Sequence, residues 1–146
     1  MAEEKFSYRM HAMDVLEFSI KEQLAIHIDL KKVKFNVTAD TKLNPDLGLL
    51  GVFVTVMIFF DKIEESIAVL KTVIGFEVKD FQQVIKKNDA GEIILPFKLE
   101  AATRRIALST TRGVLYCYLS PTYLKNAILP IVPELLMPEK KEKINP

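Results

Sequence analysis

The longest uncharged stretch of the chain, the 14 residues from Leu47 to Phe60, restricts the fold more than any other feature. A membrane-spanning helix needs about 17–25 apolar residues. This stretch is shorter, is rich in Val and Phe, and contains Gly48 and Gly51, so it predicts a buried strand over residues 49–60. Apolar residues occupy odd and even positions alike. The strand therefore either lies inside the core with both faces covered or presents one face to a second subunit.

The residues before this run predict two more strands, because apolar and polar side chains alternate along them. The first begins at Phe6 and continues to Ile20. The apolar positions change from even to odd numbers at residues 31–32, where we expect a bulge or a bend, since a slip of one residue turns every following side chain to the other face. The second strand is expected to begin at Val33.

Turn-forming residues separate the remaining segments of the chain. Asp, Asn and Pro cluster between residues 39 and 46 and predict the connection into the apolar run. A fourth strand is expected over residues 67–81, and the residues from Asn88 to Gly91 predict a loop after it.

A long helix is expected after this loop. Pro96 suits the first turn of a helix. The predicted helix runs to Arg112, and Gly113 occupies the position of a left-handed residue that would end it. Glu100 and Arg104 lie four residues apart, in the order that favours an ion pair on a helix surface.

Shorter elements are expected in the last part of the chain. These are an extended piece at residues 114–119, a two-turn helix beginning at Ser120, one further turn at 133–137, and a charged tail over 139–146 that is expected to fray. Because strands come first and helices last, the predicted class is α+β: a four-stranded antiparallel sheet packed by one long helix and short C-terminal helices. The sequence shows no internal repeat, so residues 1–146 are predicted to form one domain.

The composition favours protein partners over nucleic acid. The formal net charge is +1, and the sequence pI of about 7.8 lies below the value above about 9 that is usual for nucleic-acid-binding domains. Hydrophobic residues make up 49% of the chain, so part of the apolar surface is expected to contact other polypeptides. The N-terminal residues lack the pattern of a secretory signal, and we expect a cytoplasmic protein without an integral membrane segment.

The residues that could carry chemistry do not form a recognisable catalytic or metal-binding pattern. His11 and His27 are the only histidines, and they lie on different predicted strands. Cys117, the only cysteine, lies between two tyrosines and is expected to be a buried, inert thiol. The paired carboxylates Glu64 and Glu65 fall in a predicted turn and are expected to be solvated. The chain is therefore expected not to be an enzyme and to use no metal and no cofactor.

Residues 94–97 (Ile-Leu-Pro-Phe), then Glu100, and a run over residues 109–113 (Ser-Thr-Thr-Arg-Gly) are similar to the main helix of the bacterial secretion chaperone SecB. Residues 129–132 (Leu-Pro-Ile-Val) are similar to the stretch that leads to its second helix. The strands predicted at 33–37 and 51–60 are similar to its second and third strands.

The resemblance implies an ATP-independent holdase, which binds unfolded or extended polypeptides in hydrophobic grooves of a homotetramer built as a dimer of dimers. It places apolar residues of the second strand and of the C-terminal segment in the client groove: Val33, Phe35, Val37, Leu129, Val132, Leu135 and Leu136. It places residues of the first strand and the long helix in the oligomer interface: Phe6, Tyr8, Met10, Phe97, Ala101, Ile106 and Leu108.

Two differences from the family leave the client and the partner open. SecB proteins are commonly acidic, a charge tied to docking on the translocase motor SecA, whereas this chain is nearly neutral. The second helix of the family is interrupted here by Pro130, Pro133 and Pro138. The implied clients are therefore preproteins, with SecA as a further partner, or an antitoxin. The alternative from another class is a scaffold or a domain that binds a small apolar ligand.

Overall fold

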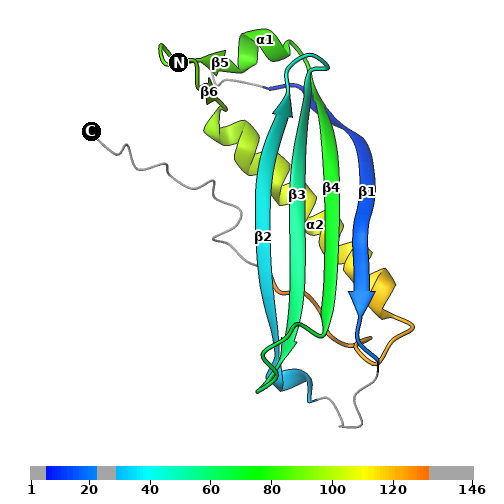
Figure 1. The fold of residues 1–146 in the computed structure, drawn as a ribbon. Coiled ribbons are helices and arrows are strands. Elements are labelled where there is room, and N and C mark those ends of the chain that lie inside the picture. Colours follow the sequence, from blue (N-terminus) through cyan, green and yellow to red (C-terminus); the bar gives the residue numbers. More distant parts are fainter. Residues whose placement is uncertain (1–5, 23–28, 132–146) are drawn as a thin grey trace.

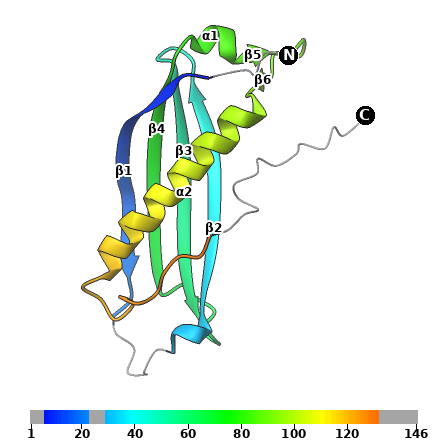
Figure 2. The ribbon, with the colours of Figure 1, turned by 180° about the vertical axis from the view of Figure 1, so that it is seen from behind.

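The computed structural model describes residues 6–22 and 29–131, which form a sheet covered on one face by a long helix (Figures 1 and 2). The elements in chain order are β1 (Tyr8–Ile20), the 3-10 helix η1 (Leu30–Lys32), β2 (Val33–Asn44), β3 (Leu49–Phe60), β4 (Ala68–Val78), α1 (Phe81–Val84), β5 (Lys86–Lys87), β6 (Ile93–Ile94) and α2 (Phe97–Leu119). The long strands pair antiparallel in the order β1-β4-β3-β2. This arrangement confirms the predicted α+β class.

The helix α2 crosses the sheet diagonally, from the β5–β6 hairpin beside β2 toward the far end of β1 (Figure 2). The Phe18 ring on β1 lies 4.7 Å from the Tyr118 ring near the end of α2, measured between centroids. Figure 2 also shows the segment after α2, drawn in orange, returning across the sheet toward β2. The helix and this returning segment together form the second layer of the fold.

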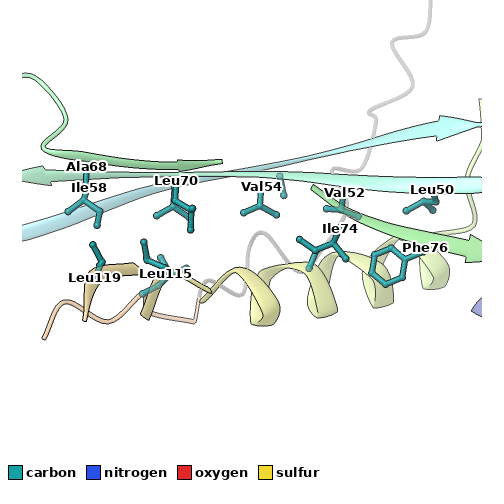
Figure 3. Packing of buried hydrophobic residues seen from close by; sticks show 14 of the residues in the cluster. Leu50, Val52, Val54, Ile58, Ala68, Leu70, Ile74, Phe76, Leu115 and Leu119 are labelled. Carbon is teal, nitrogen blue, oxygen red and sulfur yellow. The ribbon is translucent and has the colours of Figure 1, made fainter. Parts of the chain in front are cut away.

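The hydrophobic core lies between α2 and the sheet, as Figure 3 shows. Even-numbered residues of β3, from Leu50 to Ile58, are 0% exposed and face the helix. The helix supplies buried residues at every fourth position: Leu99, Thr103, Ala107, Thr111, Leu115 and Leu119. A spacing of four places these residues on one stripe along the helix.

The buried polar groups on this stripe are satisfied within the core. The hydroxyls of Thr72 on β4 and Thr111 on α2 lie 2.9 Å apart, within hydrogen-bonding distance, and the Thr111 hydroxyl also donates to the Ala107 carbonyl at 2.7 Å. Buried hydroxyls without partners would cost free energy. The contact therefore pins the middle of α2 to the centre of the sheet.

The apolar run forms β3 with the predicted bounds, but it is not covered on both faces by the described residues. Its odd-numbered residues, among them Phe53, Met57 and Phe59, are partly exposed on the face away from α2. The Lys42 ammonium lies 4.8 Å from the centre of the Phe53 ring. The Lys42 side chain thus covers part of this outer face.

Two interruptions of the alternation have different structural causes. In β1 the pairing with β4 shifts between Met10 and Ala12 and again between Val15 and Glu17, so the two bulges offset each other and the even-numbered Tyr8, Phe18 and Ile20 are all partly buried. At residues 31–32 the expected interruption is a bend and not a bulge. The chain forms η1, whose first turn is capped by the Asp29 carboxylate accepting from the Lys31 amide at 3.0 Å.

The connection between β2 and β3 is shorter than the turn-forming residues at 39–46 suggested. β2 continues to Asn44, because Asp40 and its polar neighbours lie on the exposed face of a paired strand, and the turn occupies only residues 45–48. Gly48 adopts a φ of +67°, which glycine tolerates.

The predicted fourth strand ends early, at Val78, and the buried Phe81 begins α1 instead of continuing β4.

The long helix does not end at Gly113 as predicted. It continues to Leu119, because Leu115 and Leu119 extend the buried stripe and contact the sheet, as Figure 3 shows. Residues 121–126 form turns in place of the predicted two-turn helix. The predicted turn at 133–137 and the charged tail lie outside the described residues.

Candidate functional site

A cavity of about 250 Å³ opens between β2, the middle of α2 and the segment that follows the helix. Its walls are mainly apolar, and the charged side chains among its described lining residues are two arginines. The lining residues are Val37, Arg105, Leu108, Ser109, Arg112, Leu129, Pro130 and Ile131. We call this cavity the β2–α2 groove.

One face of α2 forms a wall of the groove. Arg105, Leu108, Ser109 and Arg112 are spaced at i, i+3, i+4 and i+7, which places them on one face of a helix. The adjoining stripe, which contains Ala107 and Thr111, is buried against the sheet. Because this buried stripe packs against the sheet, the adjoining face of α2 is held toward the groove.

The segment after α2 forms the opposite wall, and buried anchors hold it in place. Leu124, Ala127 and Leu129 are at most 5% exposed, whereas Ile128 and Ile131 are 63% and 69% exposed. The segment thus fixes itself through some apolar side chains and presents others to solvent.

A hydrogen bond ties this segment to the end of β1. The Tyr123 hydroxyl donates to the Lys21 carbonyl at 2.9 Å. Burial raises the pKa of the Tyr123 phenol, and the Lys21 charge partly offsets this effect. The Lys21 ammonium itself pairs with Glu65 and lowers the pKa of that carboxyl. The phenol thus stays protonated and able to donate at neutral pH.

The third wall is β2, which lies at the edge of the sheet. Among the residues that the structure describes, β2 pairs with β3 on one side and with no strand on the other. An edge strand has backbone amide and carbonyl groups that can pair with an added strand. An extended chain beside β2 would therefore find both hydrogen-bonding groups and an apolar cavity.

A second cavity, of about 460 Å³, lies farther along the same boundary toward the start of α2. Its lining includes Asp40 and Thr41 of β2 and the ion pair of Arg104 with Glu100, whose closest atoms are 3.1 Å apart, as the i,i+4 spacing predicted. The Thr41 hydroxyl and the Arg104 Nε are buried and have no hydrogen-bond partner in the described part of the chain. This end of the boundary is mixed, because apolar side chains such as Leu43, Ile94 and Phe97 line it beside the polar groups.

The structure places the predicted groove residues in different settings. Val37 and Leu129 both line the groove, although Leu129 is only 4% exposed and packs mainly in the core. Val33 and Phe35 lie on the same face of β2 and pack against the core, but they do not line this cavity. The remaining three, Val132, Leu135 and Leu136, lie outside the described residues.

The predicted interface residues divide into exposed and partly buried side chains. Met10 and Phe97 are 46% and 48% exposed, and the neighbouring β1 residues Met13 and Leu16 are also exposed. The other five are partly buried: Phe6, Tyr8, Ala101, Ile106 and Leu108. Of these, Leu108 lies in the groove.

Sequence reasoning missed most of the helix face that lines the groove. Arg105, Ser109 and Arg112 were not among the predicted site residues, nor were Pro130 and Ile131. The i, i+3, i+4, i+7 spacing from Arg105 to Arg112 could have indicated that these residues share one face of the helix. Nothing in the sequence showed which segment would pack opposite that face.

The structure corrects one expectation about reactive groups. Cys117 is exposed on α2 and not buried, because it lies on the side of the helix opposite the stripe that contacts the sheet. His11 is exposed on β1, and His27 lies outside the described residues. No cluster of three or more His, Cys, Asp or Glu side chains suited to a metal ion occurs within residues 6–22 and 29–131.

Comparison with solved structures finds a SecB-like chaperone of Mycobacterium tuberculosis, in complex with a ChAD peptide from the HigA1 antitoxin. The TM-score is 0.51, the identity is 15%, and the match covers 86% of this chain and 89% of that one. The chain has a SecB-like fold. No protein-family model matches the sequence, and no curated protein is significantly similar to it. None of the described helices has the length and apolar character that crossing a membrane requires.

Proposed function

We propose that the protein is an ATP-independent holdase chaperone that binds extended polypeptide segments along the β2–α2 groove. The observation that carries this proposal is the position of the groove, an apolar cavity directly beside the edge strand β2. The fold shared with a SecB-like chaperone supports it. The chain would act in the cytoplasm on clients that have not yet folded.

An extended client suits both parts of this site. Its backbone can add to the edge of the sheet while alternate side chains enter cavities on one face. Residues two apart point to the same side of a strand. A client would thus place every second side chain toward the groove, with apolar residues preferred near Leu108 and Ile131.

A homo-oligomer would strengthen such binding, and exposed apolar side chains support one. Met10, Met13 and Leu16 on β1 are between 42% and 55% exposed. We propose that this strand and α2 contact other copies in a tetramer built as a dimer of dimers. Several grooves on one assembly would hold a long client with greater avidity than one groove.

A specialised client is the second candidate. The solved SecB-like chaperone carries a peptide from an antitoxin, which favours an antitoxin as the client of this chain too. A role in export with SecA stays a prediction, since the near-neutral charge of the chain offers no general attraction for a partner that selects acidic chaperones.

Replacing Ile131 with serine is expected to weaken client binding about tenfold. Ile131 is 69% exposed at the groove, so the change removes apolar contact for the client while leaving the core intact. Burying such a side chain fully contributes about 1.5–3 kcal/mol to binding. A loss of about 1.4 kcal/mol raises the dissociation constant tenfold. The measurement is the amount of chaperone that half-suppresses aggregation of a refolding client without ATP.

Leu47→Ser is the matched control for this experiment. Leu47 is 66% exposed in the β2–β3 turn and does not line the groove, so its variant should suppress aggregation as well as the parent protein. No suppression by the parent protein at stoichiometric amounts would overturn the holdase proposal. Saturable binding of a small apolar molecule without such suppression would support the alternative ligand-binding domain.

Native mass spectrometry is expected to show a tetramer that takes up unfolded client. Replacing Met10 with glutamate should shift the assembly toward smaller species, because it introduces a charge into exposed apolar surface on β1. Leu47→Glu, which adds the same charge at an exposed apolar position in the β2–β3 turn, is the control. A parent protein that stays monomeric across the micromolar range would contradict the oligomer.

A further inference from the structure

Two arginines border the β2–α2 groove and have no ion-pair partner in the described part of the chain. Arg105 and Arg112 are exposed, and neither forms a salt bridge within residues 6–22 and 29–131. Arg104, the neighbour of Arg105, differs because its guanidinium is mostly buried and pairs with Glu100 at 3.1 Å. As far as residues 6–22 and 29–131 are concerned, the groove arginines are therefore available to a bound chain.

Among the residues that the structure describes, the lining of the groove carries no negative charge. Besides the two arginines, the residues that line it are apolar or, for Ser109, neutral and polar. A client carboxylate near the groove would meet unpaired guanidinium groups, whereas a client ammonium would meet two like charges. The formal net charge of the whole chain is only +1, so this preference is local.

The spacing of the arginines matches an extended chain. They lie seven residues apart on α2, which corresponds to about 10.5 Å along the helix axis. Residues four apart on a strand lie about 13 Å apart and point to the same side. Because arginine side chains are long and flexible, they can span this difference and the angle at which α2 crosses β2. The residue midway between the two carboxylates then faces Leu108, which lies midway between the arginines.

We propose that the β2–α2 groove selects client segments in which an apolar residue is flanked by acidic residues two positions away on each side. This inference rests on the proposed function and names the class of client. The apolar side chain enters the cavity beside Leu108, and the two carboxylates pair with Arg105 and Arg112. Planar guanidinium groups suit carboxylates because they can donate two parallel hydrogen bonds.

The test compares three synthetic peptides that differ only in charge. The acidic peptide is Gly-Ser-Glu-Ser-Phe-Ser-Glu-Ser-Gly with a fluorescent label, and the other two carry glutamine or lysine in place of both glutamates. Exposed pairs of this kind each strengthen binding by about two- to fivefold. By fluorescence anisotropy at low salt, the acidic peptide should bind about five- to tenfold more tightly than the glutamine peptide, and the lysine peptide most weakly.

Variants assign the preference to the two arginines. Arg105→Gln and Arg112→Gln should each remove part of the difference between the acidic and the glutamine peptide, and the double variant should remove all of it. Lys98→Gln removes an equal charge from an exposed position of the same helix outside the groove and should leave the difference unchanged. About 0.5 M salt should reduce the preference of the parent protein, since it screens exposed charges.

The possible outcomes separate this inference from the proposed function. Equal binding of the three peptides, or tighter binding of the lysine peptide, overturns the acidic preference and leaves the groove as a polypeptide site. Failure of all three peptides, together with failure to suppress aggregation, overturns the proposed function. Displacement of the acidic peptide by a short single-stranded DNA at equal concentration would assign the arginines to phosphate groups and also overturn the inference.

Discussion

Replacing Phe76 with alanine is expected to lower the free energy of unfolding by about 3–5 kcal/mol. Phe76 on β4 is 0% exposed, and its ring meets Tyr8 of β1 edge-on, with centroids 6.1 Å apart and planes at 75°. The variant loses the transfer of a large ring from water and leaves a cavity. Because domains of this kind are stable by only about 5–15 kcal/mol, this change removes a large share of the total.

Phe59→Ala is the matched control for that prediction. Phe59 lies on the outer face of β3 and is partly exposed, so the same change should cost less than half as much. Urea denaturation followed by circular dichroism measures both variants, at one protein concentration because association would couple to unfolding. Equal losses would contradict the one-sided core and show that the outer face is covered as completely as the inner one.

Replacing Leu119 with alanine is expected to cost about 2–5 kcal/mol of unfolding free energy. Leu119 is the last residue of α2 and is 0% exposed, and it points toward the sheet near Ile58 and Ala68 (Figure 3). If the helix ended at Gly113, this side chain would have no fixed contact and the change would cost little. Thermal and urea unfolding decide between these outcomes.

Gly113→Ala provides a test of opposite sign at the same end of the helix. Gly113 lies inside α2, has no left-handed φ, and has no atom within 4 Å of an added Cβ. Alanine should therefore stabilise the protein by about 0.5–1 kcal/mol. A loss of stability would instead indicate the left-handed helix end that the sequence suggested.

The predicted and observed structures agree where short-range pattern determines the outcome. The apolar run of β3, the start of α2 after Pro96 and the Glu100–Arg104 ion pair all follow from spacing or from local backbone preference. They disagree at Gly113 and after Ser120, where local propensity favours a helix end followed by a new helix. Burial of Leu115 and Leu119 against the sheet outweighs that propensity.

The candidate site was predictable only in part, for a similar reason. The resemblance to SecB placed Val37 and Leu129 in a client groove, and the fold brings both to one cavity. Arg105 and Arg112 did not stand out, because exposed arginines on a helix are common. Their significance comes from the segment that packs opposite them, which no local pattern specifies.

The sequence by itself determined the four long strands and the place where the long helix begins, because apolar patterning and the fixed φ of Pro96 act within a few neighbouring residues. Only the tertiary structure decided the strand order β1-β4-β3-β2, the full length of α2 and the walls of the β2–α2 groove. These features depend on contacts between residues far apart in the chain. Their free energy comes from burying apolar surface jointly, and no single segment carries it.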